Sequence, residues 1–282
     1  MHLEGDLWRV FYSTRDFSQR NRVGSVDLAL SGDSVRLVAV SREPVLDVGE
    51  TGNFDCDGVY GSSIVLEGDV VRLYYGGWFA GRDGLFTSAI GLAESSDWGV
   101  TFKRIRSAPI LGRDELDPWA CMAPFVLPLP DGYRMWYSSG ISVKRLVGGG
   151  ISSLYDVKVA NSKDGISWEK SGETAISLLD SATNIARACV HETPAGFIAW
   201  YPYVPNGESS YRIGFARSED GLRFDRLDSA REARVPRQSS YSFDSRAQTY
   251  PYVFAHRSRK YLLYNGDGFG ETGFSIAVWD VK

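Results

Sequence analysis

Residues 72–79 read "RLYYGGWF", an apolar stretch built around a tyrosine, and similar stretches recur along the chain. The others read "RVFYSTRD" (9–16), "RMWYSSG" (134–140), "FIAWYPYV" (197–204) and "YLLYNGDG" (261–268). The matching tyrosines are Tyr12, Tyr75, Tyr137, Tyr201 and Tyr264, so their separations are 63, 62, 64 and 63 residues. So regular a period indicates tandem structural repeats.

Each repeat holds up to four short strand-like stretches. One follows the tyrosine, as in "AIGLAES" (89–95), one precedes it, as in "SSIVLE" (62–67), and a fourth closes the repeat, as in "TFKRI" (101–105). β-Branched and aromatic residues dominate these stretches, and Gly and Asp separate them, which is typical of propeller blades. We therefore expect an all-β chain, with residues 1–282 forming a single five-bladed β-propeller of four-stranded antiparallel blades around a central channel.

A second motif marks the turns between the last two strands of a repeat. It reads "SSDWGVTF" (95–102), "SKDGISW" (162–168) and "SEDGLRF" (218–224), and it matches the Asp-box pattern of propeller proteins such as sialidases. The Asp can accept backbone N–H groups, the Gly supplies a positive φ, and the aromatic can anchor the turn between blades. We expect these turns to be structural rather than catalytic.

Composition limits the possible partners. The net charge is −4 and no apolar run is long enough to span a bilayer, so neither nucleic acid nor a membrane is an expected partner. Three dispersed cysteines and a start without signal-peptide features favour a cytoplasmic protein with reduced thiols. Three histidines and these cysteines do not form a metal motif, so we expect no cofactor and no metal; a dimer is possible.

Function should lie where the inner strands begin, because in a propeller these strands line the channel. Asp55 and Asp57, Asp117, and Asp244 precede three of the four inner strands. Carboxyl groups gathered from several blades suit glycosidic-bond chemistry, in which one protonates the leaving oxygen and another activates water or attacks the sugar. For any single aspartate, a turn-capping role at a strand start is at least as well supported.

The chain resembles a known group of enzymes. The motifs "FDCDGV", "YYGGW", "MWYSSG", "SKDGISWEK" and "FDSRAQTYPYVF" are similar to those of bacterial glycosyl-hydrolase-like proteins associated with surface polysaccharides. The fold resembles that of arabinanases, β-xylosidases, invertases, levansucrases and mannoside phosphorylases. This resemblance implies a carbohydrate-active enzyme. Related sequences carry an acidic residue where this chain has Arg246, and an obligate cation there would remove ordinary hydrolysis if that acid is the proton donor.

Further residues complete the predicted site. Asp16 joins Asp57 and Asp117 as the catalytic set, and the predicted substrate-binding residues are Arg15, Asp55, Trp78, Arg187, Asp244, Arg246 and Tyr250. Trp78 could stack on a sugar or pack between blades, and these alternatives are evenly supported. Arginines could bind a carboxylate or phosphate of an acidic or nucleotide sugar, although pairing with the aspartates is slightly favoured.

Three alternatives therefore remain open for the function. The first is an enzyme that cleaves or transfers a glycosidic bond, the second a non-catalytic glycan-binding propeller, and the third a biosynthetic enzyme on a repurposed scaffold. We expect His191 to be packed or solvated rather than catalytic, and the run "GDGFGETG" (266–273) to form a hairpin rather than a phosphate site. The inner strand of the first repeat would fall at or before residue 1, so we expect an open or partly covered first blade.

Overall fold

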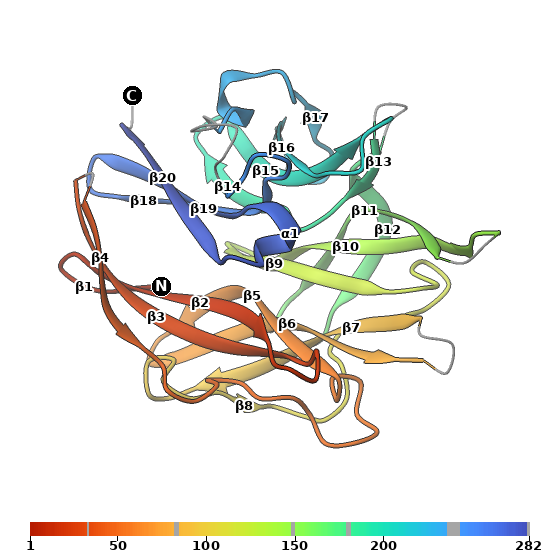
Figure 1. The fold of residues 1–282 in the computed structure, drawn as a ribbon, viewed down its shortest axis with the longest axis horizontal. Coiled ribbons are helices and arrows are strands. Elements are labelled where there is room, and N and C mark those ends of the chain that lie inside the picture. Colours follow the sequence, from red (N-terminus) through yellow and green to blue (C-terminus); the bar gives the residue numbers. More distant parts are fainter. Residues whose placement is uncertain (33, 82–84, 148–149, 179–181, 236–242, 281–282) are drawn as a thin grey trace. The chain divides into compact units, whose positions relative to one another are not determined.

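The computed structural model describes residues 1–32, 34–81, 85–147, 150–178, 182–235 and 243–280. It is almost entirely β-structure (Figure 1), with one four-residue helix, α1, and one short 3-10 segment among the described residues. No helix in the described part has the length and apolar character needed to cross a membrane. The chain forms two compact units, Met1–Met135 with Asn161–Glu169, and Trp136–Ala160 with Lys170–Lys282.

Within its described residues, the first unit contains nine complete strands. They are β1 (His2–Glu4), β2 (Leu7–Arg15), β3 (Asn21–Ser31), β4 (Ser34–Val40), β5 (Gly58–Glu67), β6 (Val70–Ala80), β7 (Phe86–Ser95), β8 (Lys103–Arg104) and β9 (Cys121–Leu129). β1 to β4 are neighbours in chain order, as are β5 to β8, so the sequence forms two antiparallel meanders. A parallel bridge between Asn21 and Gly58 joins them into one sheet.

The second unit repeats this pattern. Its complete strands and helices are β13 (Ala182–Ile185), β14 (Cys189–Thr193), β15 (Gly196–Pro205), β16 (Arg212–Ser218), β17 (Asp225–Arg226), the 3-10 segment η1 (Arg231–Ala233), β18 (Thr249–His256), β19 (Arg259–Asn265), α1 (Asp267–Gly270) and β20 (Phe274–Asp280). The strands β10 (Gly132–Arg145), β11 (Ile151–Ser162) and β12 (Glu169–Ile176) contribute residues to both units. β14 to β17 form a third antiparallel meander, and β18 to β20 form a three-stranded sheet.

Several sequence predictions can be compared with these strands. The strand-rich repeats and the β19–β20 hairpin around residues 266–273 are confirmed, because Asn265 pairs with Phe274. At the first repeat, β1 supplies a three-residue first strand that pairs with β2. The count of five blades and their closure into a single domain around a channel stay predictions.

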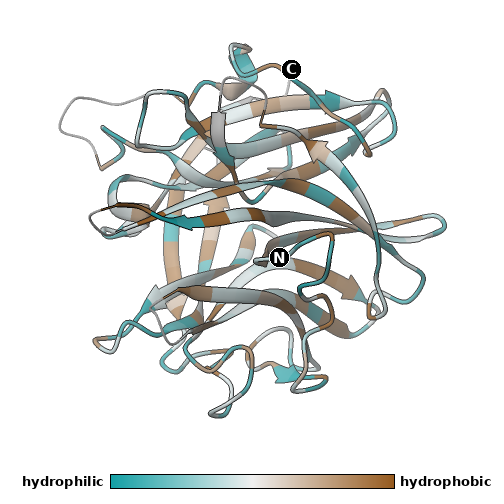
Figure 2. Cartoon of the chain, turned by 90° about the vertical axis from the view of Figure 1, so that its right-hand side faces the viewer, coloured by the Kyte–Doolittle hydropathy of each residue, from teal (hydrophilic) through white to brown (hydrophobic). Residues whose placement is uncertain are grey.

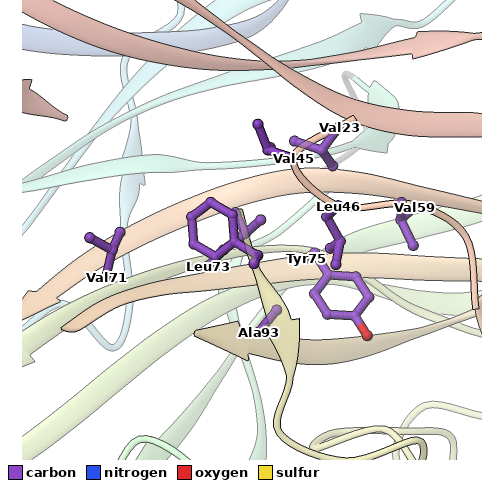
Figure 3. Close-up of a cluster of buried hydrophobic side chains, with 9 residues drawn as sticks. Val23, Val45, Leu46, Val59, Val71, Leu73, Tyr75 and Ala93 are labelled. Atoms are coloured by element: carbon purple, nitrogen blue, oxygen red, sulfur yellow. The ribbon is translucent and has the colours of Figure 1, made fainter. Parts of the chain in front are cut away.

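The apolar residues follow the strands, whereas hydrophilic residues concentrate in the connections (Figure 2). In the first unit, residues from β3, β5, β6 and β7 form a core with the segment before β5 and the turn after β7. This cluster comprises Val23, Val45, Leu46, Val59, Val71, Leu73, Tyr75, Ala93 and Phe102 (Figure 3). Burial of these side chains supplies the main stabilisation of the sheet.

The repeated tyrosine has a constant position in the sheets. Tyr12, Tyr75 and Tyr201 pair with Gly24, Gly91 and Gly214 on the following strand. A Cβ atom on Gly24 or Gly214 would lie only 2.8 or 2.7 Å from the facing tyrosine side chain. The glycines therefore leave room for the rings, which explains why the tyrosine recurs with a small residue opposite it.

The three repeated turns share one hydrogen-bond pattern. Each serine Oγ accepts the N–H of the turn glycine, at 2.8 Å for Gly99 and 2.9 Å for Gly165 and Gly221. Each aspartate Oδ1 accepts two later N–H groups, as Asp164 does from Ile166 at 2.8 Å and Ser167 at 2.7 Å. The three glycines have φ angles of 77°, 73° and 73°. The predicted local geometry of these turns is confirmed.

Each turn also contacts the preceding repeat. Its aromatic packs on the residue just before a repeated tyrosine, with ring centroids 5.4 Å apart for Phe102 and Phe11 and 6.0 Å apart for Trp168 and Tyr74. Tyr74 also donates its hydroxyl to the Gly165 carbonyl at 3.0 Å. The contacts between Trp168 and Tyr74 explain why residues 161–169 belong to the first unit. These turns therefore hold successive repeats together.

Candidate functional site

In the first unit, one row of residues crosses four strands at the end opposite the repeated turn. Arg15 at the end of β2 pairs with Asn21 of β3, Asn21 pairs with Gly58 of β5, and Gly58 pairs with Trp78 of β6. Because directly paired residues on neighbouring strands lie about 5 Å apart, this register places two sequence-predicted residues, Arg15 and Trp78, in one continuous row.

Hydrogen bonds fix the orientation of these side chains. Trp78 donates its indole N–H to Asn21 Oδ1 at 3.2 Å, and Arg15 Nε donates to the same oxygen at 3.3 Å. A Cβ atom on Gly58 would overlap the Trp78 indole, so the ring lies against the backbone of β5. Trp78 is nevertheless half-buried rather than enclosed. A fixed and partly exposed indole is suited to stacking on the C–H face of a sugar.

Asp57 lies next to this row. Its backbone N–H donates to the carbonyl of Trp78 at 3.2 Å, and its Oδ2 accepts the N–H of Ala80 at 2.7 Å. The side chain is half-buried, and Oδ1 has no hydrogen-bond partner among the described residues. The carboxyl group is therefore held by one oxygen while the other is available to a ligand.

Asp16 belongs to a charged cluster at the β2–β3 turn. Its carboxylate accepts the backbone N–H of Arg20 at 2.9 Å and pairs with the guanidinium of Arg22, which also contacts Asp47. The Arg20 N–H, followed by Arg22, lowers the pKa of Asp16 below its ordinary value. Asp16 is therefore an ionised group near neutral pH, and such a group suits a base or a stabiliser of positive charge rather than a proton donor.

The other three predicted carboxyl groups are enclosed. Asp55, Asp117 and Asp244 are each at most 1% exposed. Tyr75 donates its hydroxyl to Asp55 at 3.0 Å, and Tyr264 donates its hydroxyl to Asp244 at 3.1 Å. Asp55 also binds Arg104 Nε at 2.7 Å, and Asp244 accepts the amide of Gln248 at 2.9 Å. This geometry favours the alternative in which these aspartates stabilise strand starts, and their site roles stay predictions.

The repeat numbering separates these two kinds of aspartate. Asp55, Asp117 and Asp244 each precede a repeated tyrosine by twenty residues, as the positions 55 and 75, 117 and 137, and 244 and 264 show. The position two residues later is Asp57 in one repeat and Arg246 in another. The shared aspartate maintains the fold, whereas the variable position is free to carry a repeat-specific side chain.

Another variable position lies in or beside the strand that precedes the repeated tyrosine. Arg187 and Tyr250 have φ angles of 21° and 53°, and Ala123 has 46°, at the position fourteen residues before the repeated tyrosine. The pairing of β18 with β19 shifts register between Thr249 and Tyr252, which marks a bulge there. Bulges redirect side chains and are frequent beside active sites. Tyr250 lies at this bulge, whereas Arg187 lies in the segment between β13 and β14, and the site roles of both stay predictions.

Arg246 lies on the surface of the second unit. Its backbone N–H and its Nε bind the two carboxylate oxygens of Asp267, at 2.8 and 3.2 Å. Its carbonyl oxygen accepts a hydrogen bond from Arg212. Nearby, the hydroxyls of Tyr155 and Tyr211 contact each other, and burial raises the pKa of both, so both stay protonated at neutral pH.

Other sequence candidates lie outside these groups. His191 Nε2 lies 2.8 Å from the Val253 carbonyl oxygen, and burial lowers its pKa, which agrees with the expected packing role. The described residues contain no cluster of three or more His, Cys, Asp or Glu suited to a metal ion. Sequence reasoning missed Asn21, Tyr211 and Asp267. Asn21 is the first residue of the strand that follows the "STRD" motif, and this position in the sequence could have identified it.

Comparison with known proteins identifies relatives of the chain. The chain is 37% identical over 280 residues to the uncharacterized protein MT1551 of Mycobacterium tuberculosis (strain CDC 1551 / Oshkosh), covering 98% of this chain and 89% of that protein. It is 36% identical, with the same coverage, to the uncharacterized protein Rv1502 of M. tuberculosis (strain ATCC 25618 / H37Rv). No protein-family model matches the chain.

Solved structures show the fold. BT0996, solved as an RGII complex, superimposes with a TM-score of 0.76 at 17% identity, covering 99% of this protein and 85% of that one. The GH32 β-fructofuranosidase BmSUC1 of Bombyx mori gives 0.64 at 16%, covering 97% and 56%. The β-1,2-mannobiose phosphorylase of Listeria innocua gives 0.66 at 12%, covering 92% and 67%. The chain therefore belongs to the family of the mycobacterial proteins MT1551 and Rv1502, and it has the fold of glycoside-hydrolase-like propeller proteins.

Proposed function

We propose that the protein is a carbohydrate-active enzyme that cleaves or transfers a glycosidic bond. The observation that carries this proposal is the row Arg15–Asn21–Gly58–Trp78, with the half-buried carboxyl group of Asp57 beside it. An oriented aromatic ring, hydrogen-bonding groups and a carboxyl group at one strand end supply what a sugar-binding site needs. The glycosidase and phosphorylase names of proteins sharing the fold support the same class of function.

The two carboxyl groups of this unit differ in their surroundings. Asp16 accepts the Arg20 N–H and pairs with Arg22, which keeps it ionised, whereas Asp57 accepts one backbone N–H. Glycosidic-bond chemistry uses two carboxyl groups, one that transfers a proton and one that stays ionised. We assign Asp57, whose Oδ1 is available to a ligand, to proton transfer at the glycosidic oxygen, and Asp16 to stabilisation of the positive charge that develops on the sugar ring.

The experiment is a turnover screen on aryl furanosides and pyranosides, each with and without inorganic phosphate. The phosphate arm separates phosphorolysis from hydrolysis. Asp57→Asn should reduce turnover by about a hundredfold or more, the range expected for loss of a general acid. Asp69→Asn is the matched control, because Asp69 is exposed in the turn between β5 and β6, at the far end of those strands. Equal turnover in Asp57→Asn and wild type would overturn the assignment.

A non-catalytic glycan-binding protein is the second candidate. Arg246 favours it, because this guanidinium occupies the repeat position that Asp57 occupies in the second repeat. A binding protein would show no turnover on any substrate with or without phosphate, and Asp57→Asn would retain its affinity for sugars. Trp78→Ala would weaken binding in both cases, so it reports on the site without deciding between the two functions.

A further inference from the structure

Phe269, in the loop that joins β19 to β20, is unusual in two respects. Its side chain is 63% exposed, and its φ angle of 58° lies in the left-handed region. That region costs a residue other than glycine roughly 1–2 kcal/mol, and exposure leaves a large apolar surface in water. Packing in the core therefore does not explain why a phenylalanine stands at this position. Strained residues of this kind concentrate at ligand-binding sites.

Among the described residues, the other non-glycine residues with positive φ lie in turns or at one repeated position. Gln19 lies in the turn between β2 and β3, and Arg257 in the turn between β18 and β19. Trp98 has the same φ of 58°, but it lies in a repeated turn where its carbonyl oxygen accepts a hydrogen bond from Arg9. Ala123, Arg187 and Tyr250 share one position of the repeat, fourteen residues before the repeated tyrosine. Phe269 combines a positive φ with the larger exposure of an apolar ring, 63% against 48% for Trp98.

The Phe269 ring has a rigid support. It meets the Tyr211 ring edge to face, with centroids 6.1 Å apart. Tyr211 is buried, its hydroxyl contacts Tyr155, and its carbonyl oxygen accepts the backbone N–H of Gln248 at 3.1 Å. One part of the Phe269 ring is therefore held in place while most of its surface faces solvent.

The same loop holds a guanidinium. Asp267, two residues before Phe269, binds the backbone N–H and Nε of Arg246 and the N–H of Ala247. The Arg246 side chain is 79% exposed, and its terminal nitrogens have no hydrogen-bond partner among the described residues. One carboxylate therefore anchors both the loop that carries Phe269 and an arginine whose terminal N–H groups are available to an anion.

We propose that Phe269 and Arg246 form a contact surface for a sugar that carries a carboxylate, a uronic acid residue of a glycan. The aromatic ring stacks on the apolar C–H face of the sugar, and the terminal nitrogens of Arg246 bind its carboxylate bidentately. This inference rests on the proposed function, since it names the class of glycan that the protein recognises. Phe269 lies just after the second strand of its repeat, and Arg15 and Trp78 lie at the corresponding ends of second strands in the first unit.

The test is calorimetric binding of two probes, α-1,4-linked trigalacturonate and the neutral galactose trisaccharide with the same linkage. Wild type should prefer trigalacturonate. Arg246→Gln should weaken the binding of trigalacturonate by about tenfold, as loss of this charge-assisted contact implies, and should leave the affinity for the neutral trisaccharide unchanged. Phe269→Ala should weaken the binding of both probes.

Two matched controls exist. Arg223 is a 78% exposed arginine of the same unit, and Trp98 is a 48% exposed aromatic with the same φ as Phe269. Arg223→Gln and Trp98→Ala should bind both probes as wild type does. Phe269→Gly adds a second readout, because glycine relieves the strain. Its Tm should rise while trigalacturonate affinity falls, whereas a purely structural Phe269 would lose Tm.

The possible failures are distinct. Turnover that depends on Asp57, without any preference for the carboxylate probe or any effect of Arg246→Gln, would overturn this inference and leave the proposed function standing. Binding of neither probe by wild type, together with Asp57-dependent turnover of neutral glycosides, would also overturn the inference alone. Preferential trigalacturonate binding lost in Arg246→Gln, with no turnover of any substrate, would support this inference and the glycan-binding alternative.

Discussion

In the first unit, the repeated turn after β7 and the loop before β5 lie at opposite ends of β6 and β7, and these two regions use the repeat differently. The turns at Ser95, Ser162 and Ser218 share their hydrogen bonds and their glycine φ angles. The loops share a buried aspartate, Asp55 or Asp244, that accepts a tyrosine hydroxyl. At the position two residues after this aspartate the loops differ, with Asp57 in one and Arg246 in the other. Repetition inside one chain thus separates positions that maintain the fold from positions available for a site.

The largest expected effect lies in the turn region. Phe102 is buried against Phe11 in the core of the first unit, so Phe102→Ala should lower the free energy of unfolding by about 4 kcal/mol, as large-to-small changes of buried phenylalanine do. Urea unfolding measures this value. Val100→Ala, at an exposed position of the same turn, should change it by less than about 0.5 kcal/mol. If Phe102→Ala lowered the free energy of unfolding as little as Val100→Ala, the turns would not hold the repeats together.

The second prediction sharpens the comparison inside one loop. Asp55→Ala removes the shared partner of Tyr75 and Arg104 and should cost about 3 kcal/mol of unfolding free energy, because it leaves a guanidinium without its buried counter-ion. Asp57→Ala removes one bond to a backbone N–H and should cost about 1 kcal/mol.

Turnover should show the opposite order. Asp57→Ala should lose activity while it stays folded at the assay temperature, and the Asp55→Ala protein that remains folded should keep its specific activity. Equal unfolding costs at the two positions would remove the distinction between a fold-maintaining aspartate and a site aspartate.

The sequence predicted the strands and the turn chemistry well, because both depend on local features. The spacing of Tyr12, Tyr75 and Tyr201 reflects a constant pairing with glycines on the next strand, and the turn bonds lie within a few residues of one another. The candidate site follows only in part from the sequence. The predicted residues Arg15, Asp57 and Trp78 lie in or beside one row, and their roles stay predictions. Asn21, which joins Arg15 to Trp78, is related to Trp78 through strand register, which sequence patterns do not encode.

Burial was the other quantity that the sequence could not supply. Asp55 and Asp57 both precede the same strand, and their composition and neighbours give no reason to distinguish them. The difference arises because Tyr75, twenty residues away, directs its hydroxyl to one carboxylate and not to the other. Phe269 likewise lies in a predicted hairpin, and neither its exposure nor its positive φ can be inferred from the sequence "GDGFGETG".

The third prediction asks whether the three turns are equivalent in energy as well as in geometry. Ser95→Ala, Ser162→Ala and Ser218→Ala each remove an acceptor for a glycine N–H, so each should cost about 1–2 kcal/mol of unfolding free energy. Ser96→Ala, at an exposed position beside Ser95, is the control without this bond. A spread among the three serines larger than their mean cost would show that shared geometry does not imply a shared structural role.

The smallest effect concerns pH. The N–H groups of Ser167 and Ile166 lower the pKa of Asp164 to about 2 from its ordinary 3.8. A carboxyl group with a lowered folded-state pKa stabilises the protein fully above its unfolded pKa, and this contribution disappears as pH falls through the folded value. The unfolding free energy of wild type minus that of Asp164→Asn should therefore be largest above about pH 5 and shrink toward pH 2. The corresponding difference for Val100→Ala, which removes no ionisable group, should stay constant over this range. A constant difference for Asp164→Asn would mean that the turn aspartate acts through its shape alone, and the hydrogen bonds shared by the three turns would then not depend on its charge.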